Sequence, residues 1–278
     1  MGGVANVMAD NQYQLDGNAP RLFERDNAGP LGKPLAEQVF DHVELRAGDR
    51  VLDAACGTGI VTRVAAQRFP HVGKLVGVDR NVGMLEVARE HAPTNVPVEW
   101  KEGDLGALPF PDGSFEVVLC QNGVQFVPDK ARALREMHRV LVPGGRLAFT
   151  VWSEVTAYGA ALSEALARHV GAAAAASNQS MFQLRDARTV RDLVEAAGFR
   201  DIRIQEVVVL RPMPASAEGI VADTARTAFA HDVAAASEAA RQALGQEVSA
   251  ALQRYRDGDK LTIPHKSHLV RARAACFE

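Results

Sequence analysis

The sequence Val51–Gly59, which reads Val-Leu-Asp-Ala-Ala-Cys-Gly-Thr-Gly, constrains the fold of this chain more than any other segment. Val51 and Leu52 are strand formers that follow a Gly48-Asp49 turn signal. The glycines then break the strand, and the apolar residues after them recur at helical spacing. We therefore expect a strand, a tight turn and a helix, which is half of a βαβ unit. Such a turn lets a ligand approach the backbone and offers it the unpaired N–H groups of a helix amino terminus.

Beyond this turn, strand-like and helix-like segments alternate with short connections as far as residue 152. This alternation predicts an α/β fold with a parallel, doubly wound sheet. Helices are expected at 58–68 and 130–141, with Pro143-Gly144-Gly145 ending the second one before a strand. Two short helices should precede the first strand within 20–44, interrupted at Gly29-Pro30 and Gly32. The further expected strands are 74–78, 96–101, 115–120, 146–152, 202–210 and 263–275.

Two acids stand at the ends of expected strands. Asp79 follows Gly59 by 20 residues, the spacing at which an acidic residue meets the hydroxyl groups of a ribose. Asp53 ends the first strand, where an acid is uncommon unless it has a partner. Gly57 and Gly59 also begin the dinucleotide fingerprint G-x-G-x-x-G, but Thr62 stands at its third glycine position. An NAD(P)-dependent Rossmann oxidoreductase is therefore kept as an alternative.

Taken together, these motifs resemble the class I S-adenosylmethionine-dependent methyltransferases. The resemblance covers residues 49–152 and rests on four signals in order, at 53–59, Asp79, Asp104 and 143–145. The stretch 108–115, Leu-Pro-Phe-Pro-Asp-Gly-Ser-Phe, is similar to the ubiquinone and menaquinone C-methyltransferase branch. The resemblance implies a Rossmann-like, seven-stranded sheet whose last strand is antiparallel. It also implies S-adenosyl-L-methionine as cofactor and methyl transfer to an oxygen, nitrogen or carbon of a small-molecule acceptor.

The same resemblance implies which residues contact the cofactor. Asp53 would lie near the ammonium group of its methionine end, and Asp79 would accept from the ribose. Asp104 and the backbone of Leu105 would meet the adenine. The remaining expected cofactor contacts are Gly57, Gly59, Arg80, Met84 and Gln121.

Acceptor and catalytic residues are expected at the carboxyl edge of the sheet, where ligands of open α/β sheets bind. Gln125 and Trp152 would contact the acceptor there, and Tyr13 would do so from an amino-terminal lid. In the resembled fold the antiparallel last strand would bring His265 to this edge as the candidate general base. Other candidates for that role are His268, Glu154, His169 and His231. A base matters when the acceptor is a hydroxyl or an acidic carbon, whereas alignment alone serves a free amine.

Three parts of the chain are expected to differ in role. Residues 1–45 would form amino-terminal helices and a lid, and residues 46–154 the S-adenosylmethionine-binding core. Residues 155–278 would complete the sheet and carry a helical substrate cap at about 215–255. The alanine-rich, apolar composition of this last part favours a partly hydrophobic acceptor.

The composition argues against several classes of partner. A net charge of −3 over 278 residues, with scattered Lys and Arg, does not suggest a nucleic-acid partner. No stretch approaches 18 continuous apolar residues, so no membrane span is expected. Three distant cysteines indicate neither a disulfide framework nor a zinc site, so we expect no metal and a cytoplasmic location. A non-catalytic cofactor-binding scaffold is the second alternative, and the sequence does not indicate an oligomeric state.

Overall fold

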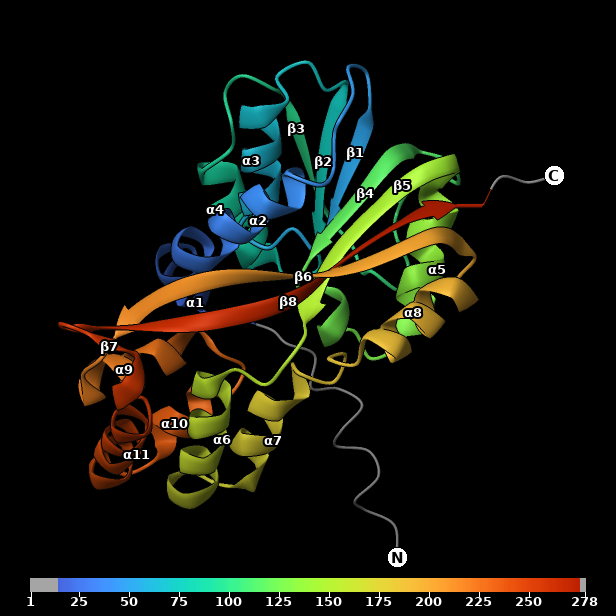
Figure 1. Ribbon diagram of the computed structural model, residues 1–278. Coiled ribbons are helices and arrows are strands. Elements are labelled where there is room, and N and C mark those ends of the chain that lie inside the picture. The colour runs from blue at the N-terminus through green and yellow to red at the C-terminus, as the bar shows by residue number, and fades with distance from the viewer. Residues whose placement is uncertain (1–14, 276–278) are drawn as a thin grey trace, which may run out of the picture.

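The computed structural model describes residues 15–275, which form one central sheet flanked by helices (Figure 1). Within these residues the strand order is β3-β2-β1-β4-β5-β8-β6, and the short β7 pairs with β8. Strands β1 to β5 pair in parallel, while β8 is antiparallel to both β5 and β6. The bounds are β1 Arg50–Ala54, β2 Lys74–Asp79, β3 Val98–Glu102, β4 Phe115–Gln121, β5 Leu141–Trp152, β6 Phe199–Pro214, β7 Arg256–Asp257 and β8 Lys260–Ala274.

This topology confirms the expected Rossmann-like sheet with an antiparallel last strand; the two-residue β7 is an addition. Both faces of the sheet are buried because helices cover each of them. Val51 and Leu52 illustrate this, since the first packs with the helices of one face and the second with those of the other. Helices α2 (Lys33–Phe40) and α3 (Ile60–Arg68) cover one face, and α5 (Lys130–Val140) and α8 (Ala187–Ala196) cover the other. Helix α4 (Val82–Glu90) packs against β2 and β3.

Strands β6 and β8 are the longest strands of the described chain, with 16 and 15 residues, and their pairing continues to Pro214 opposite Lys260. In Figure 1 this two-stranded extension runs past the sheet towards β7, and a layer of helices lies against it. The layer, called the cap below, contains α6 (Ala157–His169), α7 (Ala172–Ser180), α9 (Ala217–Asp223), α10 (Ala230–Ala235) and α11 (Glu238–Ala251). Its own apolar core joins both strands to these helices through Leu162, Phe229, Leu244 and Ile263.

The cap is assembled from two separate segments of the chain. Helices occupy the expected stretch between β6 and β8, but α6 and α7 come from the segment that follows β5. Both lie in the same layer because α6 packs against α11 as well as against α7. Sequence reasoning left this pairing out because it depends on contacts between residues about 80 positions apart.

The expected break at Gly29-Pro30 does not occur. Helix α1 (Ala19–Phe23) continues through a π-helical segment, Glu24–Gly32, directly into α2. Proline in an α-helix removes one hydrogen bond and crowds the preceding turn, whereas the wider π-helical turn accommodates Pro30. The chain therefore enters the sheet domain as one helical run rather than as two short helices.

The boundary between α5 and β5 also differs from the expectation. Helix α5 ends at Val140, and β5 begins at the next residue rather than at Arg146. Leu141 pairs with Phe115, and a shift in register then brings Arg146 opposite Val117. Residues 143–145 therefore lie within the strand, in an irregular part of it, because β5 pairs with β4 both before and after them.

The indole of Trp100, on β3, packs so closely on Gly59 and Gly77 that neither position has room for a side chain. A side chain at Gly77 would place its Cβ 2.4 Å from the ring, and one at Gly59 would place it 2.5 Å away. Gly59 also has a φ of +82°, which L-residues rarely adopt. The turn after β1 can lie over β2 and β3 only because both positions lack a side chain.

We expect Gly77→Ala to lower the free energy of unfolding by about 1–3 kcal/mol, because the added methyl group overpacks the core against Trp100. Trp100→Leu in the same chain should remove most of that penalty. Urea unfolding of the two single variants and the double variant measures the coupling, which should exceed about 1 kcal/mol. Additive effects of the two substitutions would contradict this account of Gly77.

Candidate active site

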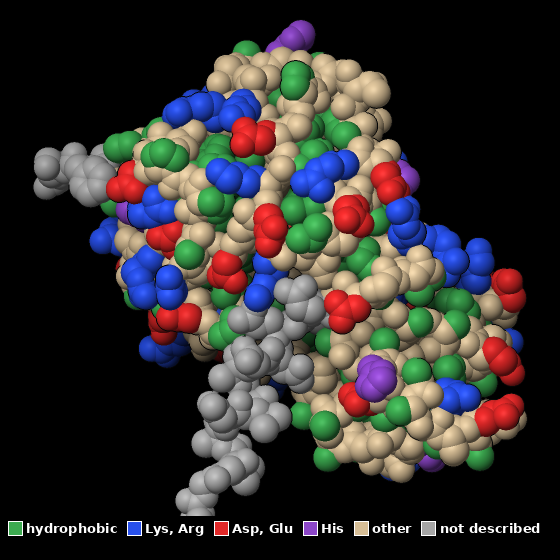
Figure 2. All heavy atoms as spheres, turned by 180° about the vertical axis from the view of Figure 1, so that it is seen from behind, with side chains coloured by type: hydrophobic (Ala, Val, Ile, Leu, Met, Phe, Trp, Pro, Cys, Tyr) green, Lys and Arg blue, Asp and Glu red, His purple; other side chains and the backbone are tan. Residues whose placement is uncertain are grey.

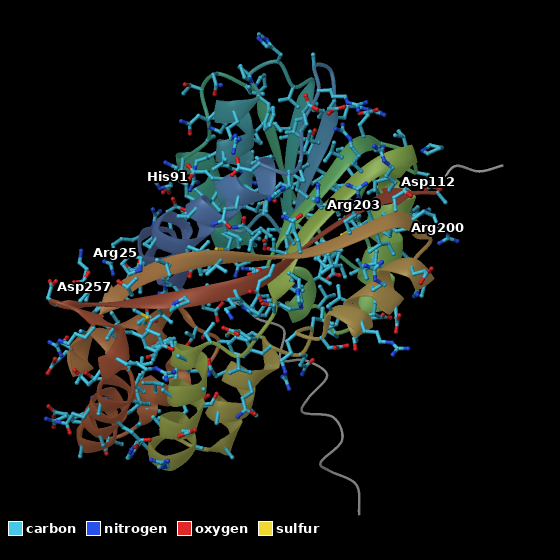
Figure 3. All side chains as sticks on the ribbon, in the orientation of Figure 1. Arg25, His91, Asp112, Arg200, Arg203 and Asp257 are labelled. Atoms are coloured by element: carbon cyan, nitrogen blue, oxygen red, sulfur yellow. The ribbon has the colours of Figure 1, made fainter. Side chains whose placement is uncertain are left out.

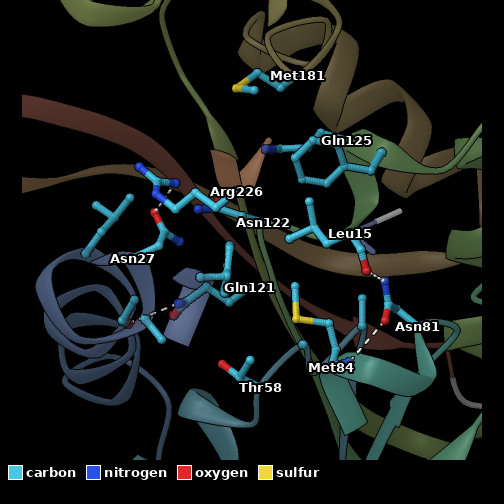
Figure 4. Close-up of a pocket in the computed structure, with 18 of the residues that line it drawn as sticks. Leu15, Asn27, Thr58, Asn81, Met84, Gln121, Asn122, Gln125, Met181 and Arg226 are labelled. Atoms are coloured by element: carbon cyan, nitrogen blue, oxygen red, sulfur yellow. Dashed lines mark hydrogen bonds between the residues drawn. The ribbon is translucent and has the colours of Figure 1, made fainter. Parts of the chain in front are cut away.

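A cavity of about 260 Å³ lies at the carboxyl ends of the parallel strands (Figure 4). Its walls are mainly apolar and come from the turns after β1 to β4, the π-helical segment and the cap. In Figure 4, Thr58 and Gln121 lie on one side of the space, Met181 and Gln125 on the opposite side, and Asn27 and Arg226 meet beside it. Surface side chains such as His91, Asp112 and Asp257 point outward in Figure 3.

Asp79 ties the turn after β1 to the end of β2. Its two carboxylate oxygens accept from the backbone N–H of Gly57 and from that of Asn81, each at 2.8 Å. Burial raises the pKa of Asp79. Asn81 in turn caps α4, where its Oδ1 accepts from the N–H of Met84 at 3.0 Å. Asp79, Asn81 and Met84 all line the cavity, so this network forms part of its wall.

Asp53 is a buried carboxylate with only one oxygen satisfied. Its Oδ2 accepts from the N–H and the hydroxyl of Thr62, at 3.1 and 2.7 Å. Its Oδ1 is buried without a hydrogen-bond partner among the described residues. Burial raises the pKa of Asp53 to about 7. Thr62, at the third glycine position of a dinucleotide fingerprint, therefore serves to hold this acid.

The two glycines of the turn have different surroundings. Gly57 lines the cavity, and its φ of +54° directs its N–H to Asp79. Gly59 is not among the lining residues and instead packs against Trp100. The indole thus requires the lack of a side chain at Gly59, and the cofactor contact expected there stays a prediction.

Asp104 and Leu105 follow β3 and also line the cavity. Asp104 is partly exposed; its Oδ1 accepts from the N–H of Gly106 at 2.7 Å, and its Oδ2 lies 3.8 Å from Arg80 Nη1. Arg80 is a further lining residue, as expected. The three acids of the sequence motifs are thus brought to one cavity from the ends of three neighbouring strands.

Two glutamines, Gln121 at the end of β4 and Gln125 in the 3-10 turn that follows, present unpaired amide atoms. Gln121 donates through Nε2 to the carbonyl of Gly32 at 3.0 Å, and its Oε1 is buried without a partner in the described chain. Gln125 accepts from the N–H of Trp152 at 3.3 Å, while its Nε2 likewise lacks a described partner. Both side chains line the cavity. Each could therefore hydrogen bond to a ligand without breaking an existing bond.

His265 is the candidate base that reaches the cavity. It is buried, and its Nδ1 lies 3.1 Å from the carbonyl of Ile263, so the neutral tautomer donates from this atom. Its ring meets that of Trp152 edge-on at 5.5 Å. Burial and the nearby charge of Arg211 lower the pKa of His265 to about 4. An imidazole of this pKa accepts hydrogen bonds at neutral pH but holds a proton poorly, which weakens its expected role as general base.

The alternative bases lie elsewhere. His268 is 2.9 Å from the carbonyl of Arg185, and His169 is 2.9 Å from Glu247 Oε2. Glu154 pairs with Lys266 on the surface. None of these side chains lines the cavity, nor does His231. The substrate contact expected at Tyr13 falls outside the described residues.

A buried charge cluster in the cap was missed by sequence reasoning. Asp223 accepts from Arg211 and Arg226 through Oδ1, and from the hydroxyl of Tyr158 through Oδ2 at 2.9 Å. Burial alone would raise the pKa of Asp223, but the two guanidinium groups hold it below its usual value. All four side chains line the cavity. The sequence did carry a signal for this cluster. Buried and exposed residues alternate along β6, and Arg211 lies at a buried position of that pattern, like Val207, Val209 and Met213.

Comparisons with known proteins agree with this geometry. Residues 52–149 match a family described as a methyltransferase domain. The 2-phytyl-1,4-naphtoquinone methyltransferase of Thermosynechococcus vestitus is 37% identical over 148 residues, which cover 49% of this chain and 65% of that protein. The demethylmenaquinone methyltransferase of Staphylococcus aureus is 33% identical over 158 residues, or 54% of this chain and 66% of the relative. The chain thus spans slightly less than two thirds of these curated relatives.

Among solved structures, phosphoethanolamine N-methyltransferase 2 of Haemonchus contortus superposes with a TM-score of 0.57 at 22% identity. The match covers 92% of this chain and 56% of that one. At this identity the likeness concerns the fold alone. The sequence match and the superposition confirm the resemblance and the fold class that were expected from the motifs.

The low pKa of His265 has a consequence for stability. Its ordinary pKa is 6.5, so between about pH 6.5 and 4 the unfolded chain takes up a proton that the folded protein excludes. The free energy of unfolding should therefore fall on acidification, by about 2 kcal/mol at pH 5 for this group. Urea unfolding at pH 7 and 5 should show that His265→Gln loses about that much less than the wild type. His91→Gln, on the surface in Figure 3, is the matched control, and equal losses in both variants would contradict the assignment.

Proposed function

We propose that this chain, whose residues 52–149 match a methyltransferase domain, transfers the methyl group of S-adenosyl-L-methionine to a small-molecule acceptor. The observation that carries the proposal is the convergence of Asp53, Asp79 and Asp104 on one cavity, with Oδ1 of Asp53 buried and unpartnered. A carboxylate oxygen left in this state suits a cationic hydrogen-bond donor. The ammonium group of the cofactor is such a donor.

The residues around the cavity fit this cofactor. Asp53 would receive the ammonium group and Asp79 the ribose hydroxyls, because each acid has an oxygen able to accept further bonds. Asp104 and the backbone of Leu105 would meet the adenine. Gly57, Arg80, Met84 and Gln121 line the same space and would complete the contacts.

The cofactor supplies an activated methyl group, so the protein's own task is to align the acceptor and exclude water. We assign that task to Gln125 and Trp152 at the sheet edge and to the cap above them. His265, being neutral, would accept a hydrogen bond from the acceptor and position it. The π-helical segment at residues 24–32 closes the remaining side of the cavity.

The acceptor class is inferred from the relatives and from the walls of the cavity. One curated relative is named for methylation of 2-phytyl-1,4-naphthoquinone and the other for methylation of demethylmenaquinone. Apolar side chains such as Leu31, Met181 and Phe182 would suit an apolar ring system. The oxidoreductase alternative has no comparable support, since Thr62 occupies the position where its fingerprint needs glycine.

Other expectations about partners stay predictions. Basic and acidic side chains are interspersed on the face shown in Figure 2, without a continuous basic stripe of the kind that follows a nucleic-acid backbone. Within residues 15–275, no helix combines the length and the apolarity needed to cross a membrane. The cytoplasmic location expected from the cysteines likewise stays a prediction.

Binding measurements test the cofactor assignment. Calorimetric titration should show that the protein binds S-adenosylhomocysteine but not NAD. Asp79→Ala should weaken that binding by about 1.5–3 kcal/mol, because it removes the carboxylate oxygens that would accept hydrogen bonds from the ribose hydroxyl groups. Asp257→Ala, an acid far from the cavity in Figure 3, is the control. Binding of NAD alone would reverse the proposal, and an unchanged affinity in Asp79→Ala would reject the ribose contact.

The raised pKa of Asp53 predicts a pH dependence of cofactor affinity. The free carboxyl takes up a proton as the pH falls through about 7, and only the carboxylate form attracts an ammonium group. Affinity for S-adenosylhomocysteine should therefore fall by about tenfold from pH 7.5 to 5.5. Asp53→Asn should bind more weakly at pH 7.5 and show a much flatter profile. The same slope in both proteins would exclude Asp53 as the group responsible.

A further inference from the structure

Gln125 offers the cavity one hydrogen-bond donor. Its side chain is buried, and its Oε1 accepts from the backbone N–H of Trp152 at 3.3 Å. A backbone N–H can only donate, so this bond fixes which end of the amide faces Trp152. The other end, Nε2, is buried and has no hydrogen-bond partner among residues 15–275. Because Gln125 lines the cavity, a ligand there can supply the missing acceptor.

His265 offers the cavity one hydrogen-bond acceptor. Its Nδ1 lies 3.1 Å from the carbonyl of Ile263, and a carbonyl can only accept, so Nδ1 carries the proton. Burial lowers the pKa of His265 to about 4, so the ring is neutral at pH 7 and Nε2 keeps a lone pair. Within the described chain Nε2 makes no hydrogen bond. His265 lines the same cavity as Gln125, and its free nitrogen therefore suits a ligand that donates.

Trp152 brings these two groups to one part of the cavity. It pairs with Ser267 across β5 and β8, and His265 is two residues from Ser267, so the side chains of Trp152 and His265 share a face of the sheet. Their rings meet edge-on at 5.5 Å. Gln125 bonds to the backbone of the same tryptophan. A donor and an acceptor, each limited to that role, therefore flank Trp152.

The walls around this pair are apolar. The ring of Trp152 also packs on Phe182, with 6.5 Å between the ring centroids, and both side chains line the cavity. Figure 4 shows Met181 on the same side of the space as Gln125. In such surroundings a polar group of a ligand needs hydrogen-bond partners, because it loses its hydration on binding. The group that binds here must therefore match the donor and the acceptor together.

Few chemical groups meet both conditions. A carbonyl or ether oxygen accepts from Gln125 but leaves His265 without a donor, and an ammonium group does the reverse. A hydroxyl group donates and accepts through a single oxygen. An amide could also bond to both residues, but it brings two polar atoms into apolar walls where a hydroxyl brings one.

We propose that Gln125 and His265 hold a hydroxyl group of the acceptor between them, so that the acceptor is an apolar alcohol or phenol. Nε2 of Gln125 donates to the hydroxyl oxygen, and the hydroxyl donates to Nε2 of His265. This inference rests on the proposed methyl transfer and names the substrate class of the same site. An imidazole that holds a proton poorly orients the O–H group without removing its proton, so His265 aligns the acceptor rather than acting as a base.

Matched pairs of ligands test the need for a hydroxyl group. 2-Naphthol and 1-octanol would be titrated calorimetrically against protein saturated with S-adenosylhomocysteine, alongside their methyl ethers and 2-naphthamide. At least one hydroxyl compound should bind about three- to tenfold more tightly than its ether, because the ether cannot donate to His265. A preference confined to one pair identifies the acceptor as a phenol or as an alcohol. The proposal is overturned if neither hydroxyl compound is preferred, or if 2-naphthamide binds more tightly than 2-naphthol.

Variants assign the effect to the two side chains. His265→Phe keeps a ring against Trp152 but lacks the acceptor, so it should lose the preference for the hydroxyl compound. His268→Phe, on the same strand but outside the cavity, is the matched control and should keep it. A preference that survives His265→Phe would come from the size of the methyl group and would overturn the assignment.

Gln125→Met tests the donor independently. It should weaken the hydroxyl compound and its ether by a similar factor of about three to ten, because both accept from Nε2. Unchanged affinity for both compounds in Gln125→Met would equally reject the proposal.

The binding of S-adenosylhomocysteine itself reports on methyl transfer separately. If the protein does not bind it, the same titrations are made on the free protein, and a hydroxyl preference that depends on His265 would support the hydroxyl site while methyl transfer is rejected. If it binds and no hydroxyl compound is preferred, methyl transfer stands and the hydroxyl site is rejected.

Discussion

The carboxylate of Asp79 holds together the edge of the sheet on which the binding site depends. By accepting from the N–H groups of Gly57 and Asn81, it fixes the turn after β1 against the end of β2. Asn81 extends this network, because it caps α4 and its side-chain amide donates to the carbonyl of Leu15 at 2.9 Å. The turn, the start of α4 and Leu15 are thereby positioned around one side chain.

The cavity is electrostatically polarised. Asp53 and Asp79 lie at the ends of adjacent strands, whereas Arg211 and Arg226 come from the β6 extension and the cap. The carboxylates at the sheet edge suit a cationic donor, whereas under the cap Asp223 accepts from both guanidinium groups. Because the cap is carried on β6 and β8, the length of these two strands decides how far apart the two charges lie.

The free site holds several polar atoms that lack partners in the described chain. Oδ1 of Asp53, Oε1 of Gln121, Nε2 of Gln125 and Nε of Arg211 are all buried in this state. Unsatisfied buried groups lower stability and are rare outside functional regions. Their concentration around one cavity means that ligands can add hydrogen bonds without displacing existing ones. The same burial accounts for the raised pKa of Asp53 and the lowered pKa of His265.

The sequence by itself determined the features that depend on short-range pattern. Alternating strands and helices predicted the parallel sheet, and the glycine turn with the 20-residue spacing of Asp79 from Gly59 predicted acids along its edge. The antiparallel last strand was implied by the family resemblance. Tertiary structure alone decided which distant segments meet. The cap joins α6 and α7 to α9, α10 and α11, Gly59 faces Trp100 rather than the cavity, and Arg211 shares Asp223 with Arg226. These outcomes depend on packing between residues far apart in the chain, and local periodicity carries no information about such contacts.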